Sequence, residues 1–120
     1  MDQAILRAIV APTKLAWKSQ LGKDLMSTYG IDEQNAISFP GTVTAVVTLS
    51  GDLEGRVLFI LTERTAKSVE AAFTSRWDEG LNQRTLNSVS ELMRPIVDNI
   101  PKLLKTGGHE CTVDLADVLN

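Results

Sequence analysis

One predicted helix carries charged and amide side chains along a single line. Asn87, Glu91, Arg94, Asp98 and Lys102 follow one another at spacings of three to four residues, and side chains three or four positions apart are neighbours on a helix surface. The row can be a solvated face, whose exposed ion pairs contribute about 0.3–0.5 kcal/mol each. Stability alone therefore does not explain the pattern.

Other candidate groups lack the partners that a catalytic, metal or phosphate site requires. His109 and Cys111 lie two positions apart, but a Cys–His catalytic pair needs a third, orienting group, and a metal site needs three or four protein ligands. Gly51 and Gly55 do not form a phosphate-binding loop, because the Lys-Ser/Thr of that motif is missing and a strand, not a helix, follows. The helical row remains the candidate site.

The helix that must carry the row is predicted over residues 84–104, with Gly107 and Gly108 as its stop. Its apolar positions fall on the opposite side of a helical wheel. Pro95 and Pro101 each remove an intrahelical hydrogen bond, and an interior proline costs about 3 kcal/mol. Because the apolar stripe keeps its phase across both prolines, the sequence favours a kinked, continuous helix. A break before Pro95 is the alternative.

Two further helices are predicted. The first covers residues 4–21, where apolar side chains recur at helical spacing and Gly22 closes the pattern. Pro12 lies inside it and is expected to kink the helix or to end a first turn. The second helix runs from Thr62, a suitable N-cap, to Phe73.

Three strands complete the pattern. Residues 43–49 and 111–115 alternate apolar with polar side chains, whereas 57–61 are apolar on both faces, which is typical of a central, covered strand. The first and second strands form a hairpin, and residues 26–41 are expected to hold turns around one short strand. The order helix, hairpin, helix, helix, strand predicts an α+β fold, with helices packed on an antiparallel or mixed sheet.

Composition limits the function further. The chain has 120 residues, with 12 Lys and Arg against 15 Asp and Glu, which fits one domain over 1–120 without a nucleic-acid footprint. The lone cysteine, Cys111, excludes an internal disulfide, and no apolar run approaches the roughly 20 residues of a membrane span. The N-terminus lacks the features of a signal peptide, so a cytoplasmic protein is expected. Trp17 and Trp77 are predicted to pack in the core.

The ordered set of segments resembles the CheX/CheC family of chemotaxis phosphatases, and within it the single-motif CheX type. The resemblance covers most of the chain. It rests on the helix end Gln20-Leu21-Gly22, the hairpin Leu49–Val57 with its GxxxG turn, the helix from Thr62 to Phe73, the segment Ser90–Asn99, and the strand Val113–Leu115.

The resemblance implies a mechanism. The family's Glu-x-x-Asn signature lies on a helix that docks on a phosphorylated, CheY-like response regulator, where the Glu pairs with an active-site lysine and the Asn amide orients the attacking water. Glu91 matches the Glu, but Arg94 stands at the Asn position. An arginine has five donors and no acceptor, so it cannot orient water in the same way. It could grip the phosphoryl group instead, or pair with Glu91 or Asp98. Asn99 points away from the row and is a poor substitute.

By resemblance we therefore expect a protein that binds a response regulator through Asn87, Glu91, Arg94 and Asp98, with weakened or lost phosphatase activity at Glu91 and Arg94. An active phosphatase and a non-catalytic dimerisation module are the alternatives. No cofactor of its own is expected, since Mg²⁺ would belong to the regulator. Family members usually continue with two further strands, so we expect these strands to be missing and the exposed sheet edge to form a homodimer.

Overall fold

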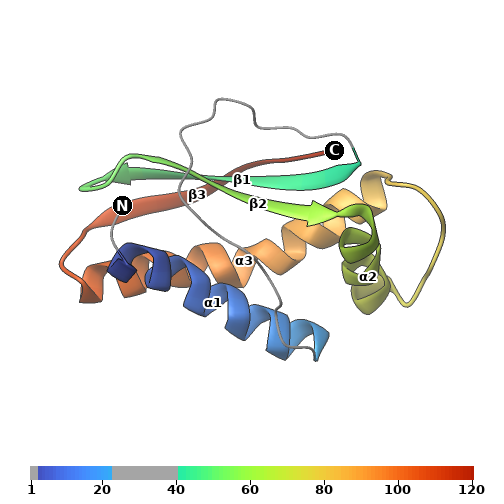
Figure 1. The fold of residues 1–120 in the computed structure, drawn as a ribbon, viewed down its shortest axis with the longest axis horizontal. Helices are drawn as coiled ribbons and strands as arrows, with labels where there is room; N and C mark the ends of the chain where they lie inside the picture. The colour runs from blue at the N-terminus through green and yellow to red at the C-terminus, as the bar shows by residue number, and fades with distance from the viewer. Residues whose placement is uncertain (1–2, 23–40) are drawn as a thin grey trace.

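The computed structural model describes residues 3–22 and 41–120. The turns and the short strand predicted over 26–41 fall almost entirely outside the described residues. The elements follow the predicted order: α1 (Gln3–Leu21), β1 (Thr42–Gly51), β2 (Gly55–Thr62), α2 (Glu63–Thr74), α3 (Gln83–Thr106) and β3 (Cys111–Leu119) (Figure 1).

The three strands form one antiparallel sheet in the order β2-β1-β3, so the predicted α+β class is confirmed. The prediction that residues 57–61 form the central strand is wrong. β1 takes that place because β3, from the far end of the described chain, pairs with its other side. On β2 the side chain of Ile60 is accordingly 50% exposed. The pairing of β1 with β3 shifts register between Val46 and Val47, where β3 carries one extra residue.

The helices lie on one side of the sheet (Figure 1). α1 and α3 pack against each other, α3 packs against β3, and α2 crosses the end of the layer, where it contacts α3 and β2. Alternate residues of β1 belong to the same buried cluster as the apolar stripe of α3, as the pleat requires. The cluster includes Val43, Ala45, Val47, Leu49, Val69, Val89, Leu92, Met93, Ile96 and Ile100.

The hairpin turn is clamped to the start of β3. The backbone N–H of Asp52 donates to the carbonyl of Glu110 at 3.0 Å, and the N–H of Glu110 donates to the Asp52 carboxylate at 2.8 Å. Gly51 has a φ of 110°, and a Cβ at this position would lie 2.6 Å from the Glu110 carbonyl oxygen. Only glycine fits both the backbone and this close approach.

α1 continues without interruption through Pro12, which is buried. The possibility that Pro12 ends a first turn is therefore wrong. Gly22 closes the helix as predicted: its φ is 68°, and its N–H donates to the Lys18 carbonyl at 2.9 Å. Within the described part of the chain, no helix is long and apolar enough to cross a membrane.

Candidate partner-binding site

The candidate site lies on α3, whose ends are fixed by its own sequence. Asn82 caps the helix in a reciprocal arrangement: its side chain accepts from the N–H of Thr85 at 3.2 Å, and the Thr85 hydroxyl accepts from the N–H of Asn82 at 3.3 Å. Gly107 ends this helix of 24 residues, and Pro95 and Pro101 lie inside it. The prediction of a continuous helix is confirmed, and the alternative, a break before Pro95, does not occur.

Side chains on opposite faces of α3 have opposite environments. Leu92, Ile96 and Ile100 are fully buried against α1 and the sheet. The α3 row, which consists of Asn87, Glu91, Arg94, Asp98 and Lys102, is exposed along its whole length. The helix therefore uses one face for the core and leaves the other free for a partner.

Glu91 and Arg94 are brought together within the row. Nη2 of Arg94 lies 3.3 Å from Oε1 of Glu91, and the side chains are 70% and 52% exposed. Of the two partners that the spacing allowed for Arg94, the structure places Glu91 and not Asp98 at the guanidinium. An ion pair this exposed is worth well under about 1 kcal/mol, so either group can leave it at little cost to contact a partner.

The remaining candidates surround this pair. Asn87 accepts a hydrogen bond from Nε2 of Gln83 at 3.0 Å, and Asp98 makes no ion pair with another described residue. Asn99 donates from Nδ2 to the carbonyl of Pro95 at 2.8 Å. Its amide is thus engaged with the helix backbone and does not join the row. Asn99 therefore does not supply the amide that the Glu-x-x-Asn signature requires.

A cluster of charged side chains around a buried Lys–Glu pair, between α2 and α3, was not predicted from the sequence. Lys67 is 4% exposed and Glu70 is fully buried. Nζ of Lys67 lies 2.8 Å from Oε1 of Glu70 and 2.7 Å from Oδ1 of Asp78. Arg84 reaches Oδ2 of Asp78 at 3.4 Å, and the Thr85 hydroxyl donates to Oε1 of Glu70. We call these five residues the α2–α3 ion cluster.

The α2–α3 ion cluster joins α2 to the start of α3. The Thr85 hydroxyl that donates to Glu70 also accepts from the Asn82 N–H, so the buried carboxylate and the helix cap share one group. Among the described residues, Oε2 of Glu70 has no hydrogen-bond partner, and it lies 3.9 Å from Nη1 of Arg84. The sequence signal was a Lys and a Glu three apart on α2, a pattern that looks like an ordinary solvated pair.

The cluster shifts the pKa of two of its members. The hydrogen bond from Lys67 lowers the pKa of Asp78 below its ordinary value of 3.8. Burial of Lys67 favours the neutral amine, but hydrogen bonds to Asp78 and Glu70 outweigh it and raise the pKa of Lys67 above 10.5. Ionised Asp78 therefore stabilises the fold above pH 3.8 and stops doing so as the pH falls through its lowered pKa. The contribution of Lys67 is constant at neutral pH and is lost only above pH 10.5.

Asp78→Asn is therefore expected to destabilise the protein at about pH 7 and to matter progressively less below pH 3.8, where the carboxyl is protonated first in the unfolded chain and then, at lower pH, in the folded protein. Urea unfolding of both proteins at about pH 7 and pH 3 measures this difference. A gap between the two midpoints that stays the same at both pH values would contradict the assignment. Asp114→Asn, on the exposed side of β3, is the matched control.

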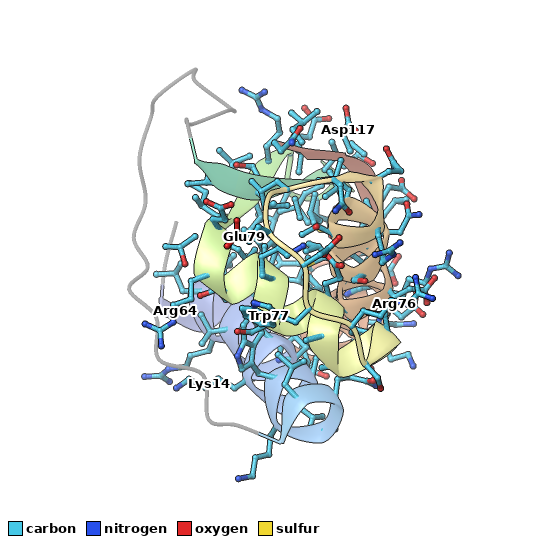
Figure 2. The ribbon with its side chains drawn as sticks, turned by 90° about the vertical axis from the view of Figure 1, so that its right-hand side faces the viewer. Lys14, Arg64, Arg76, Trp77, Glu79 and Asp117 are labelled. Atoms are coloured by element: carbon cyan, nitrogen blue, oxygen red, sulfur yellow. The ribbon has the colours of Figure 1, made fainter. Side chains whose placement is uncertain are left out.

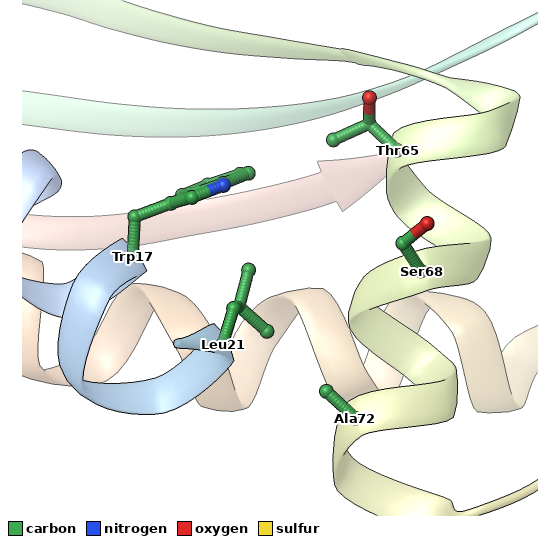
Figure 3. A pocket seen from close by; sticks show the side chains of 5 residues that line it. All are labelled: Trp17, Leu21, Thr65, Ser68 and Ala72. Carbon is green, nitrogen blue, oxygen red and sulfur yellow. The ribbon is translucent and has the colours of Figure 1, made fainter. Parts of the chain in front are cut away.

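A small hollow of about 180 Å³ lies between α1 and α2, lined by Trp17, Leu21, Thr65, Ser68 and Ala72 (Figure 3). None of the described residues that line it is ionisable. The prediction that Trp17 packs against the core is confirmed. The same prediction for Trp77 is wrong, because this side chain is 63% exposed on the loop between α2 and α3.

Among the described residues, no group of three or more His, Cys, Asp or Glu side chains could hold a metal ion.

The arrangement of these elements matches solved structures over almost the whole chain. It superposes on a CheC-like superfamily protein from Shewanella sp. PV-4 with a TM-score of 0.84, at 15% identity, covering 100% of this chain and 78% of that one. The fold is CheX/CheC-like. The chemotaxis proteins CheX from Desulfovibrio desulfuricans and Vibrio vulnificus both give TM-scores of 0.79, at 21% and 15% identity.

The CheX proteins are covered over 76% and 77% of their own length, and this chain over 96% and 97%. At the level of sequence, no family profile and no curated protein matches the chain. The CheX/CheC resemblance inferred from scattered segments is thus confirmed at the level of the fold. Sequence identities of 15–21% do not show the activity, which must be argued from the residues of this chain.

Proposed function

We propose that this protein binds the receiver domain of a response regulator in a chemotaxis or two-component pathway, through the α3 row, and that its phosphatase activity is weakened or lost. The observation that carries the proposal is the pair formed by Glu91 and Arg94 on the exposed face of a CheX-like fold. Glu91 stands where the signature Glu would meet the regulator's lysine. Asn87 and Asp98 flank it on the same exposed face.

The proposed loss of activity follows from the chemistry of position 94. Hydrolysis of an aspartyl phosphate needs a water molecule that is held in line, and an amide can accept from that water while donating to the phosphoryl group. The Arg94 guanidinium has donors only, and its contact with Glu91 at 3.3 Å competes with the lysine of the regulator. Positioning dominates catalysis of phosphoryl transfer, so a lost acceptor removes most of the rate.

Phosphate release tests the proposal. Receiver domains encoded in the same genome are phosphorylated with a small phosphodonor, mixed with the protein and followed in time. We expect release close to spontaneous decay, together with binding that Glu91→Lys abolishes by placing a cation against the regulator's lysine. Release well above spontaneous decay would instead establish the active phosphatase.

The non-catalytic dimerisation module is the second candidate, and the sheet favours it. β2 and β3 each pair with β1 on one side only within the described part of the chain. An unpaired strand edge can pair with another chain, so we include a homodimer in the proposal. We also place the protein in the cytoplasm and assign Mg²⁺ to the regulator. If no receiver domain binds and sedimentation shows a dimer, dimerisation alone is the function.

A further inference from the structure

The loop between α2 and α3, residues 75–82, carries an exposed tryptophan on a fixed backbone. We call this segment the Trp77 loop. Single exposed apolar side chains are common on protein surfaces and need no explanation by themselves. Trp77 differs in its setting, because the backbone before it is fixed to the end of α2 and the residues after it are held by the buried amine of Lys67.

The anchors come from both ends of the loop. Ser75 adopts a left-handed conformation with a φ of 58°, and its N–H donates to the Ala71 carbonyl at 2.8 Å. Directly after Trp77, the buried Nζ of Lys67 holds Oδ1 of Asp78 at 2.7 Å and the carbonyl of Gly80 at 3.0 Å. A partner that contacts Trp77 therefore has little backbone freedom to remove, which favours binding.

The Trp77 loop adjoins the α3 row. Oδ2 of Asp78 lies 3.4 Å from Nη1 of Arg84. Arg84 precedes Glu91 by seven residues, so the two lie on the same line of α3, separated by about 10 Å. A partner surface of standard size, about 800 Å² and about 30 Å across, covers both places. Figure 2 shows Arg76 on the side of the molecule where α3 lies, and Trp77 nearer the middle of this end of the molecule, over α2.

The charges next to Trp77 are mixed. Asp78 is paired with Lys67 and Arg84, whereas Arg76 and Glu79 are exposed without an ion pair to another described residue, and of these two Arg76 suits an anionic partner surface. An aspartyl phosphate adds negative charge to the face that carries it. Tryptophan and arginine are also the residue types enriched among the side chains that dominate binding energy.

We propose that the Trp77 loop is a second contact for the phosphorylated receiver domain, with Trp77 as its apolar anchor and Arg76 as its cation. This inference rests on the proposed function and extends its interface beyond α3. The receiver domain is favoured over a second copy of this chain because the loop continues the surface of the α3 row. The unpaired strand edges expected to form a dimer belong to β2 and β3 instead.

The test compares Trp77→Ala with Leu15→Ala, because Leu15, on α1, is 64% exposed and matches Trp77 in exposure. Affinity for a receiver domain that the wild type binds is measured by calorimetry, with beryllofluoride as the phosphoryl mimic. Trp77→Ala is expected to weaken binding about tenfold or more, and Leu15→Ala less than about twofold. Arg76→Glu is expected to slow association most at low salt. Thermal unfolding should be unchanged in all three variants.

The outcomes separate this inference from the function on which it rests. If Glu91→Lys abolishes binding and Trp77→Ala leaves it intact, the second contact is wrong while the proposed function stands. If the wild type binds no receiver domain, the proposed function fails first. If Trp77→Ala converts a dimer to a monomer in sedimentation, the loop is a contact between copies of this chain, and the inference is overturned.

Discussion

Glu70→Ala is expected to lower the free energy of unfolding by about 3 kcal/mol, more than removal of any exposed polar side chain described above. The carboxylate is fully buried, receives the Thr85 hydroxyl, and lies 2.8 Å from Nζ of Lys67. Its removal leaves a buried ammonium with one carboxylate fewer and a hydroxyl without its acceptor. It also opens space between α2 and α3, so packing and electrostatics act in the same direction.

The matched control is Glu91→Ala. Glu91 and Arg94 form a pair with the same three-residue spacing as Lys67 and Glu70, but on the surface. We expect a loss of at most about 0.5 kcal/mol. Urea unfolding of the three proteins provides the comparison. Equal losses for the two variants would show that burial does not set the value of these pairs.

The second large effect concerns Arg94→Asn. The variant restores a Glu-x-x-Asn sequence on the exposed face of α3, places an amide acceptor where the guanidinium stood, and frees the Glu91 carboxylate from its contact at 3.3 Å. If the proposed function is correct, phosphate release from a bound, phosphorylated receiver domain should rise about 10²-fold over the wild type, which is the size typical of one well-placed polar group at a reacting centre.

Two further variants identify the cause. Arg94→Ala also removes the guanidinium and frees Glu91, but it supplies no amide, so its phosphate release should stay near spontaneous decay. Arg94→Asn combined with Glu91→Lys should lose the gained activity together with binding. Equal activation by alanine and asparagine would mean that release of Glu91, and not the amide, limits the reaction. No gain in any variant would mean that Pro95 or another difference prevents catalysis.

Much of the fold was predictable because local patterns determine it. The apolar stripe of α3 keeps its phase through Pro95 and Pro101, and Thr62 and Asn82 are ordinary caps, so helix limits could be predicted to within a few residues. The central strand could not be predicted from β2 alone. A strand that is apolar on both faces fits either an edge or the centre, and the choice depends on a partner, β3, from the other end of the described chain.

The candidate site was predictable as a row but not in its contacts. Helical spacing allowed Arg94 to pair with either Glu91 or Asp98, and only the structure shows which one it contacts. The α2–α3 ion cluster was missed for another reason. Lys67 and Glu70 are buried where α2 meets both α3 and the loop over residues 75–82, and neither residue type indicates burial. The same loop exposes Trp77, whose residue type favoured the core.

The division of α3 into a buried face and an exposed face has a consequence for how such sequences diverge. Selection for folding acts on Leu92, Ile96 and Ile100, while substitutions in the α3 row cost almost nothing in stability. An asparagine or an arginine at position 94 is therefore equally compatible with the fold. If the proposed function is correct, a protein of this fold can lose or regain catalysis by one substitution in the α3 row without a measurable cost in stability.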